Sequence, residues 1–403
     1  MRWRRYVSVG VLLVALVCSV PAQTKPVSQR AAATAMNALW RDAAKNESGY
    51  PAKWTYDHGL VLKGIEQVWQ RTHERRYFEY IKRSMDHFVD DEGAIRTYSI
   101  SEYNIDNILP GRTLLFLYKQ TRQEKYRKAA VLLRQQIKTH PRTSEGGFWH
   151  KRIYPSQMWL DGLYMAEPFY AEYAATFNET KPFDDIARQF ILMERHSRDD
   201  NTGLLYHGWD ESKKQRWANP ETGRSPNFWA RAMGWYAMAL VDTLDHFPQQ
   251  HPQRAELIAI LNRLAVAISK YQERGSGLWY QVLDKADAKG NYLESSAACM
   301  FVYALAKGVR KRYLPATYLR VAESGYRGIV KEFLRTDANG QLNLEGTVSV
   351  GGLGGNPYRD GSYEYYLSEK VVTNDPKGVG ALLLAATEME RRGTRTTGRK
   401  RVS

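Results

Sequence analysis

Apolar residues recur at spacings of three and four positions through most of this chain, which is the periodicity of amphipathic helices. Short polar or proline-containing stops, such as Phe247-Pro248, separate the periodic windows. Strand signals are sparse and fall in connecting loops, as at residues 277–282. The pattern predicts twelve helices, at about 28–45, 55–73, 76–90, 105–121, 124–139, 156–177, 182–197, 227–246, 253–272, 293–312, 315–334 and 376–391.

The even-numbered helices of this series begin with polar or charged clusters instead of ordinary caps. Asp57 and Asp106 are 49 residues apart, and Asp106 and Asp161 are 55 apart, which suits one helical hairpin plus its loops. Six such hairpins would place alternate helices in an inner ring, with their N-terminal ends at one mouth. The predicted fold is therefore all-α, an (α/α)6 barrel, and we expect the functional site at that mouth.

The two ends of the chain differ from the body. Arg2, Arg4 and Arg5 precede an apolar run and the small residues of a cleavage site, which predicts a signal peptide over residues 1–22. That run is too short to span a membrane comfortably, so we expect an exported protein, periplasmic or secreted, without membrane contact after cleavage. Residues 23–392 are expected to form one catalytic domain, and the basic tail 393–403 to be disordered.

Charge and cysteine content narrow the function classes. The formal charge is +15, and the signal and the tail carry enough of it to leave a body of about +6. No zinc spacing, phosphate loop or basic helix with stacking aromatics is present, so nucleic acid is not an expected partner. Mild positive charge suits an acidic oligosaccharide instead. Cys299 remains alone after signal removal and is expected to be a buried thiol. Nothing indicates an oligomeric state.

Asp161 is the most informative residue of the chain. An aspartate in the first turn of a helix is ordinarily a cap or a complement to the helix dipole, and this interpretation also covers Asp57, Asp106 and Asp375. Asp161 departs from it because tryptophan, tyrosine and methionine surround it. A carboxyl group in an aromatic, partly dry pocket near a second acid can hold a proton near neutral pH and donate it. Asp161 and Asp106 are therefore the candidate catalytic acids for proton transfer to a sugar.

Two loops carry further candidates. His150 and Lys151 follow Gly-Gly-Phe-Trp just before the Asp161 helix, and this pair suits binding of a carboxylate, although a solvated loop is the alternative. His207 lies in a second loop, between a tyrosine and Gly-Trp, where a structural role is the alternative. Aromatic and histidine side chains in loops are typical of sugar sites.

Helix starts supply the remaining candidates. Trp229, Arg231 and Trp235 share one helix start, and Tyr56 begins an earlier inner helix. The planar guanidinium of Arg231 could hold a substrate carboxylate, although a core aromatic stripe with a surface arginine is the alternative. A glycine-rich run at 349–355, followed by Tyr-Arg-Asp-Gly-Ser-Tyr-Glu-Tyr-Tyr, lacks the setting of a phosphate loop. It could instead close over the mouth of the barrel.

Taken in order, these runs resemble glycoside hydrolase family 105, the unsaturated rhamnogalacturonyl hydrolases, and more distantly family 88, the unsaturated glucuronyl hydrolases. The resemblance covers Trp54 to Glu390. It is carried by Asn-Ile-Asp, Gly-Gly-Phe-Trp-His-Lys, Met-Trp-Leu-Asp-Gly-Leu-Tyr-Met, His-Gly-Trp-Asp, Phe-Trp-Ala-Arg-Ala-Met-Gly-Trp and the glycine-rich stretch with its tyrosine-rich sequel. It implies an (α/α)6 barrel that acts on oligosaccharides with a 4,5-unsaturated uronic acid at the non-reducing end.

The resemblance also implies roles for individual residues. Asp161 would protonate C4 of the enol-ether double bond and then help water add at C5, after which the ring opens and the aglycone leaves. Asp106 would contact sugar hydroxyls and keep Asp161 protonated. Arg231 would hold the uronate carboxylate. The other pocket residues implied are His150, Lys151, His207, Trp229, Trp235 and Tyr56. This chemistry requires neither a metal nor a cofactor.

Three alternatives stay open at this stage. The first is an unsaturated glucuronyl hydrolase acting on glycosaminoglycan, ulvan or arabinogalactan fragments. The second is a non-catalytic sugar-binding toroid, and the third is an inverting glycosidase on saturated chains. Two acids facing an anionic sugar argue against simple binding.

Overall fold

Alternate helices of the chain form two concentric rings. The computed structural model describes residues 25–40 and 50–398, so the expected signal peptide and residues 399–403 of the expected tail lie outside the described residues. The inner ring consists of α2 (Tyr56–Thr72), α4 (Gly111–Thr121), α6 (Leu160–Thr176), α8 (Ala230–Thr243), α10 (Ser295–Arg310) and α13 (Pro376–Gly398). The outer helices are α1 (Val27–Asn37), α3 (Arg75–Asp86), α5 (Glu124–Thr139), α7 (Pro182–Ser197), α9 (Arg254–Lys270) and α11 (Tyr318–Gly328).

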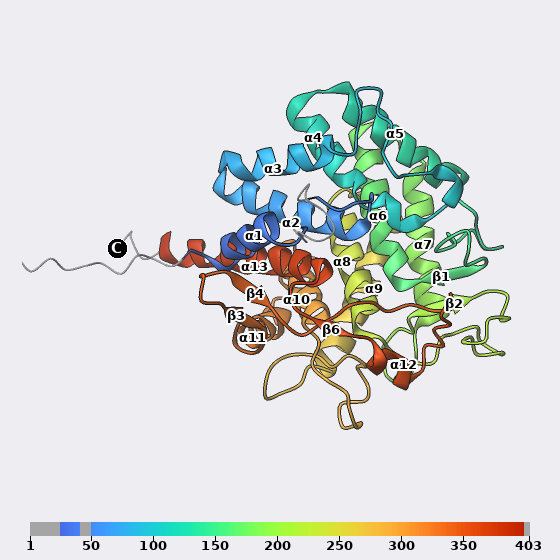
Figure 1. Cartoon of the computed structure of the whole chain (residues 1–403). Coiled ribbons are helices and arrows are strands. Elements are labelled where there is room, and N and C mark those ends of the chain that lie inside the picture. The colour runs from blue at the N-terminus through green and yellow to red at the C-terminus, as the bar shows by residue number, and fades with distance from the viewer. Residues whose placement is uncertain (1–24, 41–49, 399–403) are drawn as a thin grey trace, which may run out of the picture.

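The inner ring closes on itself. Each inner helix contacts the next one in order, and α13 packs extensively against α2, so that the last and first inner helices lie side by side (Figure 1). Each outer helix packs on the inner helix beside it, as α5 does on α4 and α11 on α10. The predicted (α/α)6 barrel is therefore confirmed.

Short antiparallel ribbons occur in the loops. The pairs are β1 (Gln157–Trp159) with β2 (Gly208–Asp210), β3 (Leu334–Thr336) with β4 (Leu342–Leu344), and β5 (Thr347–Val348) with β6 (Val371–Val372). The segment 277–282, whose sequence carries a strand signal, lies in a connecting loop and forms isolated bridges at Tyr280 and Val282 but no named strand.

Several element boundaries differ from the predicted ones. The segment 105–121 divides into the 3-10 turn η2 (Ile105–Ile108) and α4, because Pro110 between them has no N–H to donate. The segment 156–177 begins as β1, since its first residues pair with β2. The segment 315–334 ends in the π-turn η3 (Ile329–Phe333), and η1 (Ile100–Glu102) is a further short turn. Helix α13 continues to Gly398, so it overlaps the tail expected from residue 393.

The tyrosine-rich run that follows the glycine-rich run contains a short helix that the sequence pattern did not predict. Residues of the tyrosine-rich run form α12 (Tyr363–Ser368), whose N-terminus is capped by the Ser362 hydroxyl accepting from the Tyr365 N–H at 3.0 Å. A short polar-capped turn of this kind carries no helical periodicity over a long window. Its consequence is that Tyr366 is fully buried.

The interior between the rings is apolar, and the inner helices are buried on nearly all sides, as α6 is from Leu160 to Ala174 except at Asp161. At the C-terminal end of the ring, Arg112 pairs with Asp242 at 2.7 Å, and Lys307 pairs with the same carboxylate at 2.6 Å. Cys299 is fully buried, as predicted.

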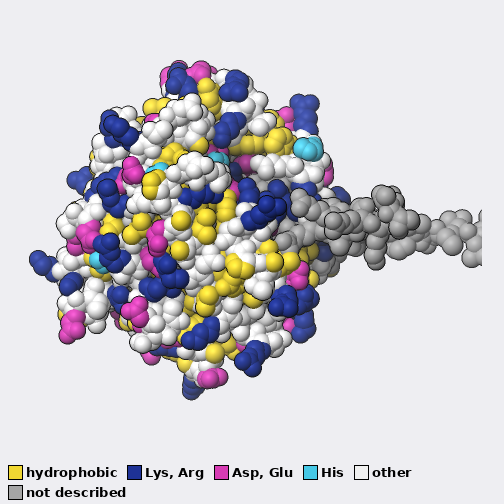
Figure 2. Space-filling view, turned by 180° about the vertical axis from the view of Figure 1, so that it is seen from behind, with side chains coloured by type: hydrophobic (Ala, Val, Ile, Leu, Met, Phe, Trp, Pro, Cys, Tyr) yellow, Lys and Arg dark blue, Asp and Glu magenta, His cyan; other side chains and the backbone are white. Residues whose placement is uncertain are grey.

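On the surface, Figure 2 shows basic and acidic side chains interspersed over the back face, where the basic side chains do not gather into one patch. Among the described helices, none is long and apolar enough to cross a membrane.

Candidate functional site

A cavity of about 230 Å³ opens at the N-terminal ends of the inner helices. Eight of the nine predicted site residues line it: Tyr56, Asp106, His150, Lys151, Asp161, Trp229, Arg231 and Trp235. The ninth, His207, is fully buried and its Nε2 lies 3.3 Å from Oδ1 of Asp161. The predicted mouth of the barrel is therefore where these side chains meet.

Backbone pairing places Asp106 against the His150–Lys151 loop. The N–H of Ile105 donates to the carbonyl of His150 at 3.2 Å, and Asn104 and Lys151 form an antiparallel bridge. The loop preceding α6 is thereby tied to the turn that begins α4. As a result, Nζ of Lys151 reaches Oδ2 of Asp106 at 2.7 Å.

A second pairing places His207 beside Asp161. Strand β1 pairs with β2 so that Trp159 faces Gly208, and the N–H of Leu160 donates to the carbonyl of His207 at 3.0 Å. A Cβ on Gly208 would lie 2.5 Å from the side chain of Leu353, so a larger residue there would push the ribbon apart. The first residues of predicted helix 156–177 had to become a strand for this contact to form.

Asp161 itself is only partly exposed, with 14 % of its side chain accessible. Burial acts to raise its pKa, but the His150 and His207 imidazoles outweigh burial and lower the pKa of Asp161 to about 2. The expectation of a neutral carboxyl group at position 161 is therefore wrong for the unliganded site. Oδ1 of Asp161 and Nε2 of His207 face each other at 3.3 Å, and neither atom forms a well-oriented hydrogen bond to a described residue.

The second acid does not act as predicted on the first. Asp106 is neutralised by Lys151, and His150 stands between the two acids, its Nε2 lying 3.4 Å from Oδ1 of Asp106 and 3.9 Å from Oδ2 of Asp161. The imidazole rings, and not the Asp106 carboxylate, are thus the polar neighbours that set the pKa of Asp161. His150 also stacks on the Trp159 ring, with centroids 4.2 Å apart.

Arg231 is buried without an acidic partner among the described residues. Its side chain is 0 % exposed, and its guanidinium lies over the Trp229 ring, 5.2 Å from the centroid. One Nη donates to the Val348 carbonyl, while Nε and the other Nη have no hydrogen-bond partner in the described chain. A buried, unpaired cation is costly unless a ligand supplies the counter-charge. The alternative of a surface arginine is wrong.

Several lining residues were not predicted as site residues: Tyr154, Trp159, Met165, Val350, Gly351, Arg359 and Lys377. Arg359 lies in the tyrosine-rich run that follows the glycine-rich run, lines the cavity and donates to the Tyr154 hydroxyl at 2.9 Å. The available signal was its place in the loop expected to close over the mouth. Lys377, the second residue of α13, pairs with Asp375 at 2.9 Å.

Glycine and aromatic contacts close the site on its other side. A Cβ on Gly351 would lie 2.3 Å from the Trp229 ring, so only glycine lets this loop lie flat against that tryptophan. The Trp229 ring also stacks on Tyr366, with centroids 5.8 Å apart. The hydroxyl of Tyr366 lies 2.8 Å from Nδ1 of His207. Because Nε2 faces a carboxylate, Nδ1 is the acceptor and the tyrosine is the donor.

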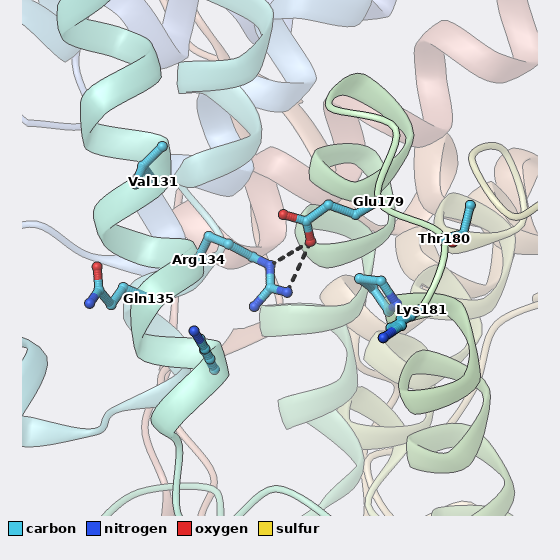
Figure 3. A pocket seen from close by; sticks show the side chains of 8 residues that line it. Val131, Arg134, Gln135, Glu179, Thr180 and Lys181 are labelled. Carbon is cyan, nitrogen blue, oxygen red and sulfur yellow. Dashed lines mark hydrogen bonds and ion pairs between the residues drawn. The ribbon is translucent and has the colours of Figure 1, made fainter.

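Two larger cavities in the described chain contain neither the predicted site residues nor an unpaired buried charge like that of Arg231. One, of about 540 Å³, lies on the outer ring between α5 and the start of α7, where Arg134 and Glu179 pair at 2.9 Å (Figure 3). The other, of about 350 Å³, lies at the opposite end of the barrel, where Arg112 and Lys307 share the Asp242 carboxylate. No predicted site residue lines either cavity, and their principal charges are already paired. Across the described residues, no three His, Cys, Asp or Glu side chains are grouped to hold a metal ion.

Comparison with known proteins is consistent with this geometry. Residues 27–393 match the sequence pattern of Glycosyl Hydrolase Family 88. A solved glycoside hydrolase from family 105 of C. acetobutylicum ATCC 824 is 48 % identical, with a TM-score of 0.87 over 91 % of this chain and 100 % of that one. The unsaturated rhamnogalacturonyl hydrolase YesR of Bacillus subtilis (strain 168) is 28 % identical over 258 residues, or 62 % of this chain and 70 % of that protein.

A more distant structure shares the fold alone. The unsaturated glucuronyl hydrolase responsible for the degradation of glycosaminoglycan, from Bacillus sp. GL1, is 14 % identical, with a TM-score of 0.64 over 85 % of this chain and 88 % of that one. The match to the family pattern spans most of the chain, from the start of α1 into α13. The protein therefore belongs to Glycosyl Hydrolase Family 88, is similar to structures of family 105, and is a glycoside hydrolase that acts on an oligosaccharide.

Proposed function

We propose that the protein removes a 4,5-unsaturated uronic acid from the non-reducing end of oligosaccharides that a polysaccharide lyase has produced, of the pectin or rhamnogalacturonan type. The observation that carries the proposal is that one small cavity holds both Asp161 and the unpaired guanidinium of Arg231. An unsaturated uronate needs a proton donor at its double bond and a cation at its carboxylate. The similarity to a rhamnogalacturonyl hydrolase supports the choice of aglycone.

In the proposed reaction the double bond, and not the glycosidic oxygen, receives the proton. Asp161 donates a proton to C4, and water adds to C5 while its own proton returns to the Asp161 carboxylate. The product is a hemiketal at C5, which opens the ring and releases the aglycone from C1. Water is consumed, and Asp161 ends in the protonated state in which it began, so one acid suffices.

The proton that Asp161 needs is gained on substrate binding. In the unliganded site the pKa of Asp161 is about 2, so this carboxyl group is an anion near neutral pH. A uronate held by Arg231 brings a negative charge and displaces water, and both effects raise the pKa of a neighbouring carboxyl group. Protonated Asp161 is therefore a property of the complex.

Binding of an anionic, unreactive ligand should accordingly take up protons. We expect calorimetric titration with a saturated galacturonic acid disaccharide, in buffers of different ionisation enthalpy, to show net proton uptake near neutral pH. Asp161→Asn should abolish that uptake while the ligand still binds. Equal uptake by both proteins would show that another group, such as His150, takes the proton.

Tyr366 is expected to position His207 for this reaction. Tyr366→Phe removes the hydrogen bond to Nδ1 of His207, and kcat should fall about fivefold to tenfold, since such a bond contributes about 1 kcal/mol. Tyr363→Phe is the matched control, because Tyr363 belongs to the same short helix and its hydroxyl donates at 3.2 Å to loop carbonyls outside the cavity. A kcat loss of equal size in both variants would point to α12 as a whole instead.

Substrate preference is tested by following the ultraviolet absorbance of the unsaturated uronate. We expect the absorbance of lyase-treated rhamnogalacturonan to fall fastest, that of lyase-treated chondroitin to fall more slowly, and saturated chains to release no sugar. Faster turnover of the chondroitin disaccharide would assign the protein to the glucuronyl alternative. Cleavage of saturated chains would overturn the proposal.

The N-terminal segment predicts that the protein is exported. Export would bring the enzyme to lyase-generated fragments outside the cytoplasm.

A further inference from the structure

Behind His150, at the ring nitrogen that does not face Asp106 and Asp161, lies a small cavity of about 10 Å³. All of its lining residues are buried: Ile105, Phe148, His150, Met158, Trp159, Gly162, Leu163, Glu167 and Gln189. This volume is about the least that holds one water molecule. The chemistry proposed above does not use this cavity.

Three buried polar atoms at this cavity have no hydrogen-bond partner among the described residues. They are Nδ1 of His150 and both carboxyl oxygens of Glu167. Glu167 is 1 % exposed, and the amide of the neighbouring Gln189 is already used by the Phe148 N–H and the Gly146 carbonyl. Buried polar atoms without partners are rare and expensive, and a buried water commonly makes about three hydrogen bonds to such groups.

The chain keeps space free beside Nδ1 of His150. A Cβ on Gly162 would lie 3.0 Å from that nitrogen, so a side chain at position 162 would fill the space. On the far side of the ring, Nε2 faces the oxygens of Asp106 and Asp161. The proton of a neutral imidazole therefore belongs on Nε2, and Nδ1 requires a donor.

We propose that a water molecule in this cavity accepts a hydrogen bond from the Glu167 carboxyl group and donates one to Nδ1 of His150, which holds His150 as a neutral imidazole with its proton on Nε2. Glu167 is thus a positioning residue for the proposed reaction. Burial, with the Asp185 carboxylate adding to it, raises the pKa of Glu167 well above its usual range, although Arg142 acts in the opposite sense, so Glu167 carries the proton it donates.

The effect on catalysis follows from charge. The pKa of about 2 for Asp161 includes the attraction of a charged His150 ring, so a ring held neutral removes that contribution and lets Asp161 take up its proton more readily when substrate binds. Burial lowers the pKa of His150, helped by Lys151 and His207, while Asp106 and Asp161 raise it. A hydrogen-bond donor at Nδ1 lowers the pKa of His150 further. The reason is that this donor stabilises only the neutral imidazole, whose Nδ1 carries a free lone pair.

The test is titration of His150 by NMR in the whole ¹⁵N-histidine-labelled protein, with its resonance assigned by loss in His150→Gln. Glu167→Leu replaces a carboxyl group that has no hydrogen-bond partner among the described residues by an apolar side chain of similar size, and it is expected to fold. We expect the pKa of His150 to rise by about one unit in this variant, which lowers the neutral fraction up to about tenfold. Glu167→Gln retains a donor and should restore the wild-type titration.

Activity provides the second readout and depends on the proposed function. Glu167→Leu should lower kcat and move the alkaline limb of the kcat–pH profile to lower pH, because Asp161 then loses its proton more readily in the complex. Glu167→Gln should recover most of the lost rate. An unchanged His150 titration in the leucine variant would overturn the inference, whatever the enzyme's substrate proves to be, because the NMR measurement needs no substrate. Equal titration shifts in the leucine and glutamine variants would also overturn it.

Discussion

Replacing Asp161 by asparagine is expected to lower kcat by about 10²–10⁴-fold, the usual contribution of a general acid. Asparagine has nearly the same shape and keeps a donor toward the cavity, but it cannot give a proton to carbon. The measurement is the initial rate of absorbance loss on lyase-generated pectin fragments, with saturating substrate.

Binding should not suffer in the same variant. In the unliganded protein Asp161 is an anion, because the pKa is about 2, and it therefore repels an anionic sugar. The dissociation constant of the fragment should stay the same or fall in Asp161→Asn. Asp57→Asn is the matched control, since Asp57 lies in the first turn of an inner helix but outside the cavity lining, and its kcat should be unchanged. Wild-type turnover in Asp161→Asn would remove this residue from the acid role.

Replacing Arg231 by methionine should raise KM about 10- to 100-fold, because a hydrogen bond to a charged group contributes about 1.5–3 kcal/mol. The reason is that Nε and one Nη of Arg231 have no partner in the described chain and are free to hold the uronate carboxylate. The methyl ester of the same fragment serves as a chemical control. Its KM should change far less, since it has no carboxylate for Arg231 to neutralise.

Stability separates this binding role from a structural one. Removing an unpaired buried charge should leave the free energy of unfolding unchanged or raise it. Arg112→Met should have the opposite effect, because Arg112 pairs with the buried Asp242. Its loss should lower the free energy of unfolding by about 3 kcal/mol, even though Lys307 still pairs with that carboxylate. Urea denaturation measures both. A strong loss of stability in Arg231→Met would mean that this guanidinium serves the fold and not the ligand.

The helices and their order could be predicted because their signal is local. Every predicted segment contains a helix, and α5 spans residues 124–139 as predicted. Polar clusters at alternate helix starts identified the inner ring, since only those ends converge on a shared mouth. The prediction was least accurate where a long-range contact competed with periodicity, as at β1, where residues expected to be helical pair with a strand about fifty positions away.

The identity of the site residues also followed from the sequence, but their charge states did not. Asp161 was expected to be neutral on the basis of its aromatic neighbours and Asp106. The structure shows that Lys151 forms an ion pair with Asp106, and that the imidazoles of His150 and His207 face Asp161. Those neighbours come from separate loops, and their distances depend on backbone pairings that leave no trace in local spacing.

By itself, then, the sequence determined the helical ring, the mouth where its inner helices begin, and the residues gathered there, because periodicity and helix-start chemistry act over short stretches of chain. Only the tertiary structure decided which charges meet. It left Arg231 buried without a counter-ion, set His207 behind Asp161 and placed Glu167 behind His150. Electrostatic energy depends on the separation of groups in space and on their burial, and both are properties of the assembled barrel.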